Sequence, residues 1–133
     1  MALRLASVAY LAPDYDEAIA WFCYAVGFEL IEDSDLGDGK RWVVVAPHRC
    51  EGARLVIAKA TDERQRAALG EAHGGRVGYF LATDDFARDH AAFVARGVKF
   101  LEAPRREAYG IVAVFEDFLA NKWDLIEPAE AKR

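Results

Sequence analysis

Apolar residues in the first half of the chain recur with two different periods. Those at 18, 21, 22, 25 and 26 have the spacing of a helix with one buried face, which begins near Pro13 and Asp14 and ends at Gly27. Other apolar runs predict strands at 4–11, from 28 to 31, at 42–46 and at 54–58. Because 42–46 is continuously apolar, we expect a central strand there. The stretch 35–39 has the composition of a turn between strands.

The second half repeats this order of elements. Leu11-Ala12-x-Asp14 recurs as Leu81-Ala82-x-Asp84, and Gly27 recurs as Gly97, all at an offset of 70 residues. The pattern predicts a helix from 84 to about 96, a turn region at 104–109, and strands at 76–83, 98–101, 111–116 and 122–126.

This duplication predicts an α+β fold of two βαβββ modules, with mixed β-sheet and flanking helices. One βαβββ half alone leaves sheet edges and an apolar face uncovered, so we expect the halves to pair. The expected boundaries are about 1–60 for module 1, 61–74 for the linker and 75–128 for module 2. Thr61 to Gly70 is expected to form a short helix that Thr61 or Asp62 caps.

Composition limits the function classes. The chain has 133 residues and a formal net charge of −5, which suits a single domain and argues against nucleic acid and anionic membranes as partners. The N-terminal residues lack the pattern of a signal peptide, so we expect a cytoplasmic protein. Cys23 and Cys50 are expected to be reduced thiols.

Several polar and aromatic residues allow more than one interpretation. His48, His73 and His90 have no metal-ligand spacing, and Gly37-Asp38-Gly39 suits a hairpin turn better than a phosphate loop. Arg105-Arg106 is either solvated surface or a grip for an anion. Each of the following is either a ligand contact or an ordinary structural residue: Trp42, Tyr109, Trp123 and Asp124.

The chain also resembles the vicinal oxygen chelate superfamily, which includes glyoxalase and bleomycin-resistance proteins. The residues that carry the resemblance are 14–22, 26–30, 83–86, 97–100, 114–117 and 121–125. The resemblance implies modules that curl into a partly open β-barrel or cleft, a small molecule bound there, and homodimers. It also implies, for many members, a divalent metal held by residues on the first and last strands of each half.

The metal positions of the family fall here on Ser7, Leu55 (or Val56), Gly78 (or Val77) and Asp124. Only Asp124 has a good ligating group, so we expect no metal and no cofactor. The family turn Asp-Pro-x-Gly-Asn is replaced by Asp117-Phe118-Leu119-Ala120-Asn121, and since Ala resists positive φ we expect a different turn type. Phe118 and Leu119 pack either on a partner subunit or in the local core.

Three functions remain open. The favoured hypothesis is a small-molecule binding protein without metal, with ligand-binding candidates Ser7, Trp42, Leu55, Gly78, Tyr109, Trp123 and Asp124. The alternatives are a metal-dependent lyase, isomerase or dioxygenase of the same superfamily, and a structural or regulatory dimer without a small ligand. The sequence does not decide whether the protein is an enzyme.

Overall fold

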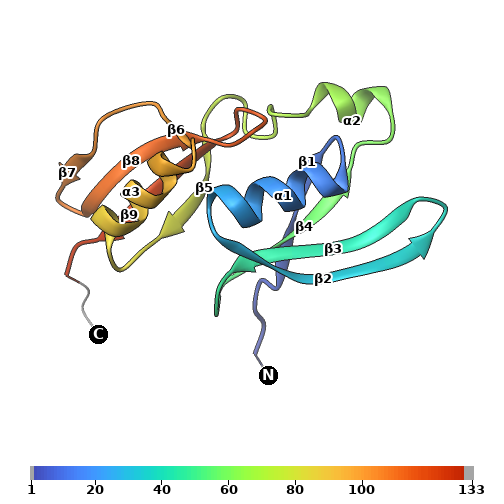
Figure 1. The fold of residues 1–133 in the computed structure, drawn as a ribbon, viewed down its shortest axis with the longest axis horizontal. Helices are drawn as coiled ribbons and strands as arrows, with labels where there is room; N and C mark the ends of the chain where they lie inside the picture. Colours follow the sequence, from blue (N-terminus) through green and yellow to red (C-terminus); the bar gives the residue numbers. More distant parts are fainter. Residues whose placement is uncertain (1, 131–133) are drawn as a thin grey trace. The chain divides into compact units, whose positions relative to one another are not determined.

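The computed structural model describes residues 2–130 and consists of two compact units, Met1–Leu69 and Gly70–Arg133. Each unit contains a sheet with one longer helix (Figure 1).

The first unit has a four-stranded sheet in the order β1-β4-β3-β2. β1 is parallel to β4, and the other neighbours are antiparallel. Its elements are β1 (Ser7–Ala12), α1 (Tyr15–Ala25), β2 (Phe28–Gly37), β3 (Lys40–Pro47), β4 (Arg54–Lys59) and the short α2 (Glu63–Ala67).

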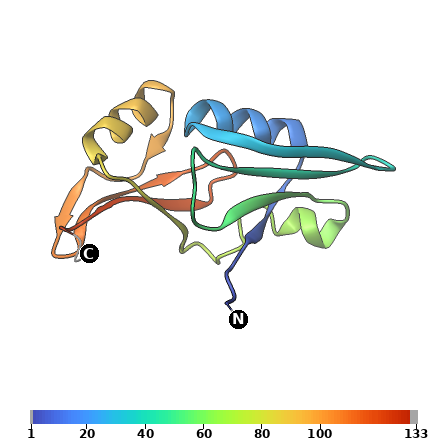
Figure 2. The same ribbon diagram turned by 90° about the horizontal axis from the view of Figure 1, so that it is seen from below.

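Helix α1 begins where the sequence predicts it. The Asp14 carboxylate accepts a hydrogen bond from the Glu17 N–H at 2.8 Å, and Gly27 leaves the helix with φ +70°. The helix runs along one face of its sheet (Figure 2) and buries Phe22 against Tyr10, with ring centroids 5.0 Å apart. This contact fixes which side of β1 faces the helix.

The second unit has the sheet order β5-β9-β8-β6, with β7 also paired to β8. Its elements are β5 (Val77–Ala82), α3 (Phe86–Ala95), β6 (Lys99–Phe100), β7 (Arg105–Glu107), β8 (Gly110–Glu116) and β9 (Lys122–Pro128). β5 is parallel to β9, which matches the β1–β4 pair of the first unit.

The predicted duplication is confirmed in the order of elements. β1 and β5 cover residues 7–12 and 77–82, at the predicted offset of 70, and Gly97 ends α3 with φ +88° as Gly27 ends α1. The α+β fold class of two strand-and-helix modules is therefore confirmed. Asp62 caps α2, as expected, by accepting from the Gln65 N–H at 2.8 Å.

Two predicted boundaries are wrong. The turn expected at 35–39 is confined to Asp38 and Gly39, because β2 continues through Gly37 along β3. Both turn residues have positive φ, as a tight hairpin requires. The predicted turn region 104–109 contains the strand β7, because Arg105 to Glu107 pair with β8 through a short hairpin.

The turn before β9 also differs from its prediction. Ala120 has φ +67°, so the positive φ that a glycine would supply is kept despite the β-carbon. The buried Asp117 carboxylate accepts from the N–H groups of Leu119 and Asn121 and from the Trp123 indole N–H, at 2.9–3.0 Å. These hydrogen bonds stabilise the turn and offset the strain at Ala120. Phe118 and Leu119 are both half-buried.

Candidate ligand-binding face

Each sheet has one face that packs on its helix and one that does not; we call the latter the helix-distal face. Side chains alternate along a strand, and residues paired in register share a face. In the second unit Phe115 contacts Phe93 of α3, with ring centroids 5.5 Å apart, so Phe115 and its partner Trp123 face the helix. The adjacent pair Val114 and Asp124 therefore lies on the helix-distal face.

Phe80 lies beside Asp124 on this face. It pairs with Asp124 in the β5–β9 register, and 69% of its surface is exposed. Large aromatic side chains are normally buried, so an exposed Phe next to a carboxylate marks a surface with an apolar and a polar part. Phe80 was not among the residues predicted from the sequence, although strand alternation places it on the side of β5 opposite to Tyr79.

The Asp124 carboxylate is not satisfied by the protein. Its Oδ1 atom is shielded from solvent and has no hydrogen-bond partner among residues 2–130. Burial raises the pKa of Asp124 above its usual value; the Arg105 charge lowers this pKa, and the Glu102 charge raises it further. An unpartnered, desolvated carboxylate is costly unless a ligand or water completes its hydrogen bonds.

Arg105, the cation beside Asp124, is already engaged by other carboxylates. Its Nε donates to Glu102 Oε1 at 2.9 Å, and its Nη1 donates to Glu107 Oε2 at 2.5 Å. Glu102 also accepts the Val114 N–H at 2.9 Å, and the Arg105 hydrogen bond holds the pKa of Glu102 below its usual value. Arg105 therefore stabilises this part of the sheet and is not a free grip for an anion.

The seven residues predicted as ligand contacts fall in different places. Ser7 and Trp42 lie on the helix-distal face of the first sheet, Asp124 lies on that of the second, and Trp42 is 41% exposed. Tyr109 lies between β7 and β8 and is 54% exposed.

Leu55 and Trp123 are instead buried on the helix-facing sides. Leu55 shares a face with Ile57, whose partner Tyr10 contacts α1. Trp123 is 4% exposed and stacks on Tyr79, with ring centroids 4.5 Å apart. The position on β4 that shares the face of Ser7 is therefore Val56.

Gly78 is crowded by a histidine. The β5–β9 register shifts between Val77 and Tyr79, and the His73 ring lies where a β-carbon on Gly78 would stand. The same ring makes an edge contact with Tyr79, with centroids 5.0 Å apart. Residue 78 thus carries no ligating group, and its space is filled from the segment before β5.

The donor atoms at the family's four metal positions do not fit a divalent ion. Ser7 offers a neutral hydroxyl, Val56 and Gly78 offer no side-chain donor, and Asp124 is a single carboxylate. Within residues 2–130, no group of three or more His, Cys, Asp or Glu side chains is placed to hold a metal ion.

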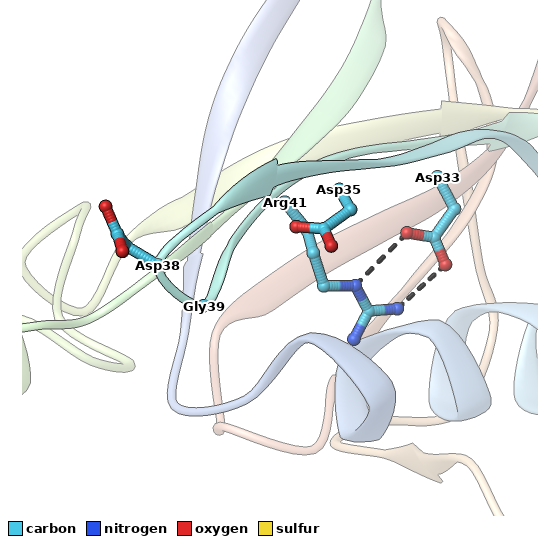
Figure 3. Close-up of a pocket in the computed structure, with 5 residues that line it drawn as sticks. All are labelled: Asp33, Asp35, Asp38, Gly39 and Arg41. Atoms are coloured by element: carbon cyan, nitrogen blue, oxygen red, sulfur yellow. Dashed lines mark hydrogen bonds and ion pairs between the residues drawn. The ribbon is translucent and has the colours of Figure 1, made fainter.

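A hollow of about 450 Å³ lies at the β2–β3 hairpin, lined by Asp33, Asp35, Asp38, Gly39 and Arg41 (Figure 3). Arg41 donates to both Asp33 oxygens, at 2.7 and 3.1 Å, and also contacts Asp16 at 3.0 Å. Asp38 points away from this pair. Asp33 and Asp16 hold Arg41 over the Tyr15 ring, and Asp35 accepts from the Gly37 N–H, so the hollow is a consequence of hairpin packing.

Comparison with known proteins agrees with the fold. The sequence profile of the Glyoxalase/Bleomycin resistance protein/Dioxygenase superfamily matches residues 4–125. An uncharacterized protein of Shewanella frigidimarina (strain NCIMB 400) is 42% identical over 128 residues, which cover 96% of this chain and 95% of the relative. The chain therefore belongs to the glyoxalase/bleomycin resistance protein/dioxygenase superfamily.

Two solved structures are similar over nearly the whole chain. The crystal structure of UcmS2 has a TM-score of 0.83 and 26% identity, covering 96% of this chain and 99% of UcmS2. TnmS3, described as an antibiotic binding protein from Streptomyces sp. CB03234, has a TM-score of 0.69 and 29% identity, covering 97% of this chain and 99% of TnmS3. Among the helices formed by residues 2–130, none has the length and hydrophobicity needed to cross a membrane.

Proposed function

We propose that this chain binds a small organic molecule on the helix-distal face around Asp124 and Phe80, without a metal ion or other cofactor. The observation that carries the proposal is the shielded Asp124 Oδ1, which lacks a partner among residues 2–130, next to an exposed phenylalanine. Small-molecule sites typically combine apolar area with a few polar groups that orient the ligand.

The comparisons support binding as the activity. TnmS3, at 29% identity, is an antibiotic binding protein, and its likeness covers 97% of this chain. The donor-poor positions Ser7, Val56 and Gly78 favour binding over the metal-dependent lyase and dioxygenase chemistry of other superfamily members, because that chemistry needs a full ligand set.

The test is a fluorescence titration of metal-depleted protein with bleomycin and with a panel of aromatic antibiotics. We expect saturable binding for at least one compound, unchanged by EDTA, and weakened about tenfold or more by Phe80→Ala. Tyr24→Ala is the matched control, because Tyr24 is an exposed aromatic residue on α1.

Two results would contradict the proposal. One is a stoichiometric divalent ion in the purified protein together with a turnover that chelation abolishes, which would favour the enzymatic alternative. The other is an absence of binding across the panel, which would favour a structural or regulatory dimer.

We also propose that the protein is a homodimer, as the family resemblance implies. Leu3 and Leu5, just before β1, are 95% and 69% exposed, and β1 is an end strand of its sheet in the described part of the chain. Exposed apolar residues beside the open edge of an end strand favour association. Sedimentation equilibrium of the wild type and of Leu5→Glu tests this: we expect the wild type to be dimeric and the variant to dissociate at higher concentration, and a monomeric wild type contradicts it.

A further inference from the structure

We propose that Asp124 makes this face selective for ligands that carry a positively charged amine beside an aromatic group, and that it rejects anionic ligands. This inference rests on the proposed function and adds the chemical class of the ligand.

The position of Asp124 makes it a recognition group rather than a surface charge. It lies on β9, between β5 and β8, and its register partners are Phe80 and Val114. Its Oδ1 atom is shielded from solvent and unpaired within residues 2–130. By contrast, Asp117 in the turn before β9 accepts several hydrogen bonds from the protein. A hydrogen-bond donor on a ligand supplies what the protein leaves out.

The surrounding charges decide which donor fits. Three carboxylates, Asp124, Glu102 and Glu107, accompany the single guanidinium of Arg105, and Arg105 is bonded to Glu102 and Glu107. Lys122, two residues before Asp124, is the register partner of Glu116 on β8, and Glu116 forms an ion pair with Lys99 at 3.6 Å. With these groups included, four carboxylates face three cations. A cation therefore completes the charge balance near Asp124, and an anion meets net negative charge.

Phe80 specifies the rest of the ligand. Because it is directly opposite Asp124 in the β5–β9 register and largely exposed, one ligand can contact the carboxylate and the ring together. An aromatic ligand packs on this ring, and an ammonium group near its face gains a cation–π interaction. The pair therefore fits an aromatic amine better than an amine or an arene alone.

The experiment uses three indoles with short side chains whose terminal groups differ in charge: tryptamine (cation), tryptophol (neutral) and indole-3-acetate (anion). Each is titrated into the ¹⁵N-labelled full chain near pH 7, and amide shifts on β5, β8 and β9 report binding. We expect tryptamine to bind about tenfold or more tightly than tryptophol, and indole-3-acetate to bind most weakly.

Asp124→Asn is expected to reduce tryptamine affinity about tenfold or more, because the charge that distinguishes tryptamine from tryptophol is then no longer recognised. Asp35→Asn, the same change in the β2–β3 hairpin, is the control and should have no effect. If tryptophol binds and tryptamine binds no better, or if Asp124→Asn changes nothing, the ligand class is wrong while binding on this face stands. If none of the three perturbs β5, β8 or β9, the ligand class is wrong, and the antibiotic titration of the wild type and of Phe80→Ala decides separately whether this face binds a small molecule.

Discussion

The imidazole ring of His73 lies against the α-carbon of Gly78, in the space that a β-carbon on residue 78 would take. The contact joins the segment before β5 to the beginning of that strand and places the ring edge-on to Tyr79. Gly78, which falls at a metal position of the family, therefore provides space for the His73 ring.

Gly78→Ala is expected to destabilise the protein by no more than about 1 kcal/mol, because the new methyl group overlaps the ring of the exposed His73, which must turn away. Urea unfolding monitored by circular dichroism measures the change. In a His73→Ala background the same substitution should cost much less, since the space is then free. Equal losses in both backgrounds would show that the His73 contact is not the cause.

Ala120→Gly is expected to stabilise the protein by about 1 kcal/mol. Ala120 has φ +67°, where a β-carbon is strained, and glycine removes the strain without disturbing the hydrogen bonds of Asp117. Ala91→Gly is the matched control within α3 and should destabilise by about 1 kcal/mol. A loss of stability in Ala120→Gly would contradict the left-handed conformation of this residue.

The two tryptophans Trp42 and Trp123 should respond differently to replacement by phenylalanine. Trp123→Phe removes the indole N–H that donates to the buried Asp117 at 2.9 Å, so we expect a loss of about 1–2 kcal/mol in the free energy of unfolding. Trp42→Phe should change stability by less than about 0.5 kcal/mol, because Trp42 is 41% exposed and phenylalanine keeps most of its apolar contact. Thermal and urea unfolding measure the free energy of unfolding of each variant. If the two variants lost similar amounts, the different locations of the two rings would be contradicted.

Asp124→Asn should change the pH dependence of stability. The pKa of Asp124 is raised in the folded state, so the wild type loses stability as pH rises through that pKa and the carboxylate ionises. We expect the variant to be the more stable protein at pH 7 and the difference to vanish at acidic pH.

Asp33→Asn is the control of opposite sign. The Arg41 hydrogen bond lowers the pKa of Asp33, so its stabilising effect is present at neutral pH and is lost as pH falls through the folded pKa. This variant should be less stable than the wild type at pH 7 and equal to it in acid. Stability profiles of the two variants that run in the same direction would contradict the assigned environments.

The repeated order of strands and helices was predictable from the sequence alone. Helix periodicity, the Asp14 cap and the glycines that end α1 and α3 are local signals, and each appears in the structure where it was expected. The two wrong boundaries, at β2 and β7, lie where pairing with a neighbouring strand extends a segment that local composition marks as a turn.

Tertiary structure decided which residues can meet a ligand. Alternation along a strand separates two sets of side chains, but it does not say which set the helix covers. The packing of the helices on the sheets placed Leu55 and Trp123 inside, and Trp42 and Asp124 on the helix-distal faces. The neighbours of Asp124 come from separate strands and from the segment before β7, so no spacing in the sequence announces them. The φ of Ala120 was likewise fixed by hydrogen bonds to Asp117, because those bonds outweigh the local preference of alanine.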